Sequence, residues 1–298
     1  MSHVLVLAGA AKSRALSDAL LGACVALVDE IVSPVWLDEG VSAEIALSSP
    51  PRPDAASLLA RLRSALAGHE VDAAIVAAQE RRKKLFLADM DSTMIEQECI
   101  DELASRLGLR AEVSAVTERA MRGEIAFETA LRERVALLKG LPVGIVDELL
   151  ESSITLQPGA RTLVQTMRAD GAYCCLVSGG FTLFTSRIAE ILGFHEHRAN
   201  RLVTRDGRLT GEVEEPILGH EAKRDALIEL RERFALARQA VLAVGDGAND
   251  IGMLAEAGLG VAYRAKPAVA AAAHVRIDHG DLASLLYLQG YRRGEFVE

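Results

Sequence analysis

The stretch LFLADMD at residues 85–91 is an apolar run that ends in two aspartates, and two later stretches share its design, YCCLVSGG at 173–180 and AVLAVGDG at 240–247. Helical segments fill the intervals between these runs. Such an alternation predicts a parallel sheet that is covered by helices on both faces. Because ligands of these sheets bind at the carboxyl ends of the strands, we expect Asp89, Ser178 and Asp246 at one edge of one sheet.

The interval between the first two runs spans some eighty residues, far more than one crossover connection needs. It contains two apolar stripes at helical spacing, one at Ile100, Leu103, Ala104 and Leu107 and one at Phe127, Leu131, Val135 and Leu138. We therefore predict an inserted helical cap at about 96–155. A cap that directly follows the strand of Asp89 would exclude water from a site there and supply contacts to a substrate.

Residues 1–80 read as a separate α+β unit, with the order strand, helix, two strands, helix, strand. This is the order of a ferredoxin-like domain. Serine and proline at 48–53 indicate a loop inside it. The basic cluster at 81–84 is expected to be a solvated linker, so that a second unit occupies 84–298.

Composition excludes several classes of protein. The chain has 298 residues, 50% apolar and 25% charged, which is a globular balance and enough for two folding units. Its longest uncharged apolar stretch, Ala19 to Val28, is half of the ~20 residues that cross a bilayer, so no membrane partner is expected. The first residues lack the pattern of a signal peptide, and we expect a cytoplasmic protein with reduced cysteines. The net charge of −9 disfavours nucleic-acid binding.

Asp89 and Asp91 lie two residues apart in DMDST, directly after an apolar strand. In a continuing strand they would share a face, and a cation would offset their repulsion. Oxygen donors with no nearby cysteine or histidine favour Mg²⁺ over zinc. The alternative for an isolated pair is that one aspartate caps a helix and the other is solvated. GDGAND at 245–250 adds Asp246 and Asp250 at another strand end.

VSGG at 177–180 places a hydroxyl group and two glycines between a strand and a helix. Ser178 and the nearby N–H groups can hold an oxyanion at a helix N-terminus, although a serine that only caps the helix would look the same. A phosphate there would need a neutralising cation. Lys223 is the candidate, and the adjacent Arg224 competes with it.

Taken in order, DMDST, Glu98, the helical cap with Phe127 and Arg134, VSGG, Lys223 and GDGANDIGML resemble the haloacid dehalogenase-like phosphatases, and within them the phosphoserine phosphatase family. The resemblance covers about residues 84–280. It implies a Rossmann-like core with a helical cap, and Mg²⁺-dependent hydrolysis of O-phospho-L-serine as the last step of serine biosynthesis. The N-terminal unit resembles an ACT-like domain. Its fold is compatible with pairing into a homodimer, with feedback by serine and with a support for folding.

The resemblance also implies roles for individual residues. Asp89 would be the nucleophile and Asp91 the general acid and base, with Lys223 as the third catalytic residue. Mg²⁺ would be held by Asp89, Asp246 and the backbone carbonyl of Asp91, and Asp250 would support either the metal or the lysine. The phosphoryl group would be bound by Ser178, Gly179 and Gly180, while Asn249 would bind phosphate or water.

Substrate selection would belong to the cap. Arg134 follows Phe127 by seven residues and lies on or beside the apolar face of its helix. By the resemblance Arg134 binds the substrate carboxylate, Glu98 binds the ammonium group and Phe127 contacts the substrate. Without the resemblance, Arg134 and Glu98 could equally be surface charges.

Other functions compete with this hypothesis. A phosphatase or phosphotransferase for another small amino-acid phosphate would use the same residues. A non-catalytic phospho-acceptor switch also clusters aspartates at a sheet edge, but it needs no large insertion over the site. A DxD glycosyltransferase explains Asp89 and Asp91 and leaves VSGG, Lys223 and GDGAND without a role.

Overall fold

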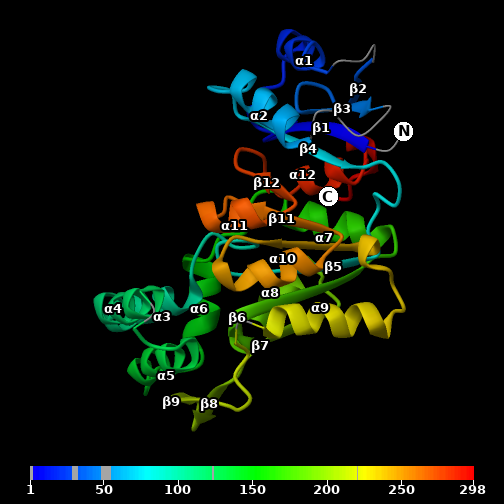
Figure 1. Cartoon of the computed structure of the whole chain (residues 1–298). Helices are drawn as coiled ribbons and strands as arrows, with labels where there is room; N and C mark the ends of the chain where they lie inside the picture. Colours follow the sequence, from blue (N-terminus) through cyan, green and yellow to red (C-terminus); the bar gives the residue numbers. More distant parts are fainter. Residues whose placement is uncertain (1–2, 29–32, 48–54, 123, 220) are drawn as a thin grey trace.

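The computed structural model describes residues 3–28, 33–47, 55–122, 124–219 and 221–298. The loop predicted at 48–53 lies outside these residues. Figure 1 shows a small N-terminal sheet stacked above a larger sheet, with a group of helices and a hairpin at the opposite end of the molecule. None of the helices in the described part of the chain has the length and apolarity that crossing a membrane requires.

The N-terminal unit is ferredoxin-like, as predicted. Its elements are β1 (His3–Gly9), α1 (Asp18–Val25), β2 (Val35–Asp38), β3 (Ser42–Leu47), α2 (Ala55–Ala65) and β4 (Val71–Ala77). The strands form an antiparallel sheet in the order β2-β3-β1-β4. Alternate residues of β1 point to opposite faces of this sheet, and both faces of the sheet are buried. Leu5 and Leu7 pack beneath α1 and α2, whereas Val4 and Val6 belong to the core of the larger unit.

The larger sheet is parallel throughout, with the order β12-β11-β10-β5-β6-β7, which confirms the predicted core. Its strands are β5 (Leu85–Ala88), β6 (Tyr173–Phe181), β7 (Glu196–Asn200), β10 (Val241–Gly245), β11 (Leu259–Tyr263) and β12 (Val275–Ile277). One face is covered by α9 (Ala222–Arg233), α10 (Ile251–Glu256) and α11 (Pro267–Ala272). The other is covered by α7 (Ala160–Ala169), α8 (Thr182–Leu192) and α12 (Ser284–Leu288).

The cap consists of α3 (Cys99–Leu107), α4 (Arg110–Met121), α5 (Phe127–Leu137) and α6 (Ile145–Ser152). Two adjacent segments join it to the core: Ile95 pairs with Leu156, and Glu96 N donates to Thr155 O at 2.9 Å. Leu107, predicted in an apolar stripe, is exposed at the end of α3. The insertion thus leaves and re-enters the core at one narrow point, directly after DMDST.

The hairpin of β8 (Leu202–Arg205) and β9 (Arg208–Val213) turns at Asp206-Gly207, as the sequence indicates. The alternation of apolar and polar residues about Asp206-Gly207 predicts a hairpin beside the core sheet, but the structure places the hairpin against the cap. Gly140 N donates to Leu209 O at 2.8 Å, and Val143 N donates to Gly207 O at 2.9 Å. The hairpin therefore extends the cap beside α5, because main-chain groups that follow α5 find their partners in β9 (Figure 1).

The basic cluster at 81–84 is not a solvated linker. Lys83 is buried, and its Nζ donates to Glu80 O and Gln239 O, each at 2.7 Å. Arg81 pairs with Glu44 across the joint at 2.7 Å. The charges of Arg81 and Lys83 lie inside a packed joint, because backbone carbonyls and a carboxylate satisfy them there, whereas Lys84 is exposed.

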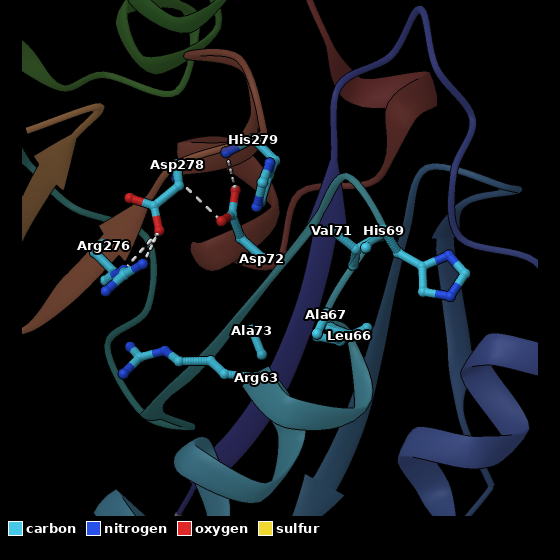
Figure 2. Close-up of a pocket in the computed structure, with 11 residues that line it drawn as sticks. Arg63, Leu66, Ala67, His69, Val71, Asp72, Ala73, Arg276, Asp278 and His279 are labelled. Carbon is cyan, nitrogen blue, oxygen red and sulfur yellow. Dashed lines mark hydrogen bonds and ion pairs between the residues drawn. The ribbon is translucent and has the colours of Figure 1, made fainter.

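Asp72 of β4 joins the two units at a second point (Figure 2). Its Oδ1 accepts from Asp278 N at 3.0 Å, and its Oδ2 accepts from His279 N at 3.0 Å and Gly280 N at 2.8 Å. The carboxylate is almost fully buried, so these three donors replace its hydration. The N-terminal sheet is thereby tied to the loop that follows β12.

Candidate active site

Asp89 directly follows β5, and its N–H donates to Val244 O at 3.0 Å, which continues the pairing with β10. Its Oδ1 lies 2.6 Å from the Nζ of Lys223, in the first turn of α9, and both side chains are buried. The same ammonium group lies 2.6 Å from Asp250 Oδ1. Arg224 is instead exposed and pairs with Glu221, so the fold selects Lys223 as the cation of this edge.

Asp250 organises the GDGAND turn from inside. It is fully buried, and its Oδ2 accepts from Asp246 N at 3.2 Å and from Gly247 N at 2.9 Å. A Cβ at position 245 would lie 2.3 Å from Asp250 Cγ, so this position requires glycine. The turn closes around one carboxylate, which in turn holds Lys223.

Three acidic side chains converge here, because oxygens of Asp89, Asp246 and Asp250 all lie within 4.8 Å of one another. Burial, with the charge of Asp250, raises the pKa of Asp89 well above its usual range. Burial opposes the charged form of Lys223, yet Asp250 and Asp89 outweigh it and raise the pKa of the lysine. Three carboxylates around one ammonium group leave excess negative charge, and this all-oxygen donor set fits a hard divalent cation.

Asp91 has different partners from Asp89. Its Oδ1 accepts from Cys99 N at 2.8 Å, and its Oδ2 accepts from Ser178 Oγ at 3.1 Å. The strand does not continue to these carboxylates, so the condition for a shared strand face is not met: β5 ends at Ala88 and the chain turns after it. Among the described residues, Asp91 is outside the converging acidic group. Burial raises the pKa of Asp91, which favours a carboxyl group that carries a proton.

VSGG forms a bulge at the end of β6. Val177 pairs with Arg198 and Phe181 pairs with Asn200, so the residues 178–180 leave the ladder. Helix α8 begins only at Thr182, which corrects the expectation that VSGG opens the helix. Gly180 N donates to Ser178 Oγ at 2.8 Å, and a Cβ at position 180 would lie 2.9 Å from Asp91 Oδ2. Glycine therefore lets this turn approach the DMDST loop.

Cap and core residues meet above this turn. A Cβ at position 179 would lie 3.9 Å from Phe127 Cζ and 4.0 Å from Asn249 Nδ2. Phe127 comes from α5 of the cap, and Asn249 comes from the GDGAND turn. The fold thus brings one residue of the cap and one residue of the core to Gly179.

Arg134 is partly buried in the cap. Its Nε donates to Ala130 O at 3.3 Å and its Nη1 to Thr117 Oγ1 at 3.5 Å. Burial lowers the pKa of Arg134, while the charges of Asp101 and Glu98 oppose this shift. Among the described residues, no carboxylate lies within 4.0 Å of its guanidinium group, so the charge is free to meet an anion.

Glu98 precedes α3 and accepts from Ser92 Oγ at 2.7 Å. Solvent reaches the residue, but the surrounding protein partly desolvates its carboxyl group and, with the charge of Asp91, raises its pKa to about 7. Arg134 and Glu98 lie close enough for their opposite charges to interact.

Three groups that hold side chains or backbone of the site were not predicted from the sequence. Thr93 Oγ1 donates to Asp246 Oδ1 at 3.0 Å, and the backbone N–H of Cys99 holds Asp91. Asn200 Nδ2 donates to Gly179 O at 2.9 Å. Thr93 is the last residue of the DMDST motif, so its position next to the predicted site could have been inferred from the sequence. Asn200 ends β7, whose half-buried, polar residues carry no apolar run that would indicate a core strand.

Known proteins are similar to this chain in fold and in sequence. A model of the haloacid dehalogenase-like hydrolase family matches residues 86–255. Phosphoserine phosphatase of Polaromonas sp. (strain JS666) is 49% identical over 210 residues, which are 69% of this chain and 89% of that protein. A solved structure described as a phospho-aspartyl intermediate analogue of phosphoserine phosphatase is 40% identical, with a TM-score of 0.64 over 69% of this chain and 98% of that chain.

A second solved structure is similar over both sheets. It is a hydrolase of the same family from Salmonella enterica serovar Typhi, 28% identical, with a TM-score of 0.84 over 97% of this chain and 98% of that chain. The arrangement of an antiparallel N-terminal sheet on the capped parallel core therefore recurs in another protein.

Proposed function

This chain belongs to the haloacid dehalogenase-like hydrolase family, and on that premise we propose that it hydrolyses O-phospho-L-serine to L-serine and phosphate, the last step of serine biosynthesis. One observation carries the proposal. The buried Asp89 carboxylate lies 2.6 Å from Lys223 at the end of β5, and the cap that follows it brings Phe127 to the Gly179 turn. The curated relative with 49% identity is a phosphoserine phosphatase.

The side chains support a reaction in two steps. An oxygen of Asp89 attacks phosphorus, and the bond between phosphorus and the serine oxygen breaks while Asp91 gives that oxygen its proton. Asp91 then takes a proton from water, the water oxygen attacks the aspartyl-phosphate, and phosphate leaves Asp89 free again. Lys223, Ser178 and the N–H groups of the glycine turn offset charge on the phosphoryl oxygens.

We propose Mg²⁺ as the cofactor. Asp89, Asp246 and the backbone carbonyl of Asp91 would hold it, and Asp250 supports the lysine and the turn. When bound, the ion supplies charge compensation between an anionic nucleophile and an anionic substrate. The excess of three carboxylates over one ammonium group is the property of this chain that supports a divalent cation.

Substrate selection rests on the cap. We propose that Arg134 binds the substrate carboxylate and Glu98 its ammonium group, since the two charges lie close enough to interact and Arg134 has no carboxylate partner among the described residues. Phe127 would close the site over Gly179, and Asn249 would bind a phosphoryl oxygen or the water. The carboxyl group of Glu98 must be ionised for this role.

The experiment is phosphate release from phosphoserine, phosphothreonine and homoserine phosphate, with and without Mg²⁺. We expect phosphoserine to have the highest kcat/KM, with turnover that requires the ion. A higher kcat/KM for another amino-acid phosphate would contradict the substrate assignment. Stoichiometric phosphorylation without sustained release would instead indicate a phospho-acceptor switch.

Three expectations stay predictions. We propose that the N-terminal unit is ACT-like, that the chain forms a homodimer and that it acts in the cytoplasm. The ferredoxin-like strand order supports the first of these. Size measurement in solution would test the second, and fractionation of cells would test the third.

A further inference from the structure

Asn200, at the end of β7, makes two hydrogen bonds to backbone groups of two different segments. Its Nδ2 donates to Gly179 O at 2.9 Å, and its Oδ1 accepts from Leu218 N at 2.7 Å. The residue is only 2% exposed. A buried amide with both its acceptor and a donor engaged has a determined orientation, because reversing it would leave both partners unsatisfied.

The bulge in β6 explains why a side chain is needed here. Between two ladder pairs, Val177 with Arg198 and Phe181 with Asn200, β6 advances four residues while β7 advances two. The Gly179 carbonyl therefore leaves the ladder, and the side chain of Asn200 replaces the backbone donor that a regular strand would offer.

The Gly179–Gly180 peptide is consequently held at both ends. Asn200 holds its carbonyl, and the N–H of Gly180 donates to Ser178 Oγ at 2.8 Å. Ser178 Oγ in turn donates to Asp91 Oδ2 at 3.1 Å. A continuous series of hydrogen bonds thus connects Asn200 with the carboxyl group that the proposed reaction uses as acid and base.

We propose that Asn200 is a positioning residue for phosphoryl binding, which holds the Gly179–Gly180 peptide and, through Ser178, the orientation of Asp91. This inference rests on the proposed function and adds to it a residue outside DMDST, VSGG, Lys223 and GDGAND. The link through Leu218 also relates the glycine turn to the segment that leads into α9 and Lys223. Asn200 itself contacts the turn and not the substrate.

The test compares Asn200→Ala with Gln165→Ala. Gln165 is a matched control, because its Nε2 also donates to a backbone carbonyl, Leu192 O at 2.6 Å, outside the catalytic edge. For Asn200→Ala we expect kcat/KM on phosphoserine to fall by about 10- to 100-fold, as misplacement of catalytic groups produces. Inhibition by inorganic phosphate should weaken about tenfold, because one lost hydrogen bond of this size weakens binding to that extent. Gln165→Ala should change neither quantity by more than about twofold, because it leaves the turn intact.

Asn200→Asp is the second variant, since it preserves the shape and the acceptor for Leu218 N but removes the donor to Gly179 O. It should show the same loss of kcat/KM and of phosphate inhibition, which keeps the test decisive if the alanine variant does not fold. Wild-type kinetics in either folded variant, with lowered thermal stability alone, would overturn the positioning role. A wild-type enzyme inactive on phosphoserine would refute the proposed function instead, so the two failures are distinguishable.

Discussion

Asp250, at the catalytic edge, and Asp72, at the joint between the two sheets, are both buried aspartates that accept hydrogen bonds from backbone N–H groups. Asp72 accepts three such bonds from residues 278–280. Asp250 accepts two from its own turn and also binds Lys223. They differ in the charge around them, because Asp250 lies close to two further carboxylates, Asp89 and Asp246.

The difference separates a structural acid from a functional one. At the joint, three backbone N–H groups hold one carboxylate, and Asp72 belongs to no cluster of acidic side chains among the described residues. At the catalytic edge, three carboxylates share one ammonium group, so the folded chain is left with a charge that a cation or a reaction must compensate. Both aspartates are buried, so burial alone does not distinguish the structural aspartate from the functional one.

Asp89→Asn should produce the largest effect. We expect turnover of phosphoserine to fall by about 10³-fold or more, because an amide oxygen cannot serve as the nucleophile. Asp72→Asn should leave kcat/KM within about twofold, because its hydrogen bonds end in the joint. Steady-state phosphate release from both variants measures the contrast. Comparable activity losses in the two variants would contradict the functional difference between the catalytic edge and the joint.

Removal of the divalent metal should produce the second largest effect. Chelation should lower activity by about 100-fold or more, since the charge at the nucleophile is no longer compensated. Adding Mg²⁺ back should raise the melting temperature by several degrees in the wild type and in Asp72→Asn. The shift should be lost in Asp246→Asn. Calorimetry with and without Mg²⁺ checks this, and an unchanged shift in Asp246→Asn would contradict the assigned ligand.

Arg134→Ala tests the cap. We expect kcat/KM for phosphoserine to fall by about 10- to 100-fold, mainly through KM, because a desolvated carboxylate would lose its cation. Arg132→Ala is the control, as Arg132 lies on the same helix and pairs with Glu215 at the surface. Activity on p-nitrophenyl phosphate, which has no carboxylate, should change little in either variant. Equal losses on both substrates would assign Arg134 to the structure of the cap.

The smallest expected effect concerns stability, and its sign differs between the two regions. Asp72→Asn should lower the free energy of unfolding by about 1–3 kcal/mol, because its amide group would face backbone donors. In metal-free protein, Asp89→Asn should raise it by about 1 kcal/mol, because it removes repulsion with Asp250 while its oxygen can still accept from Lys223. Urea unfolding of both variants measures this, and a loss in Asp89→Asn would refute the charge argument.

Much of the fold followed from local patterns. The run LFLADMD, the helical stripes around Leu103 and Leu131, and the strand order of the first 80 residues led to the two sheets and the cap. The errors have a common cause. The pattern places Lys83 in solvent and the hairpin beside the core sheet, and both placements are wrong because partners distant in the chain decide burial.

By itself, the sequence determined which strands end in carboxylates, hydroxyl groups and glycines, because hydrophobic periodicity reports which face of each element is buried. The phosphoryl-transfer chemistry at that sheet edge was implied by the resemblance of these motifs to a known phosphatase family. Only the tertiary structure decided that Lys223 and not Arg224 faces Asp89, that Asp91 turns to Ser178, and that Asn200 holds the glycine turn. These choices depend on hydrogen bonds across 21 to 134 residues of chain, whose geometry no local pattern contains.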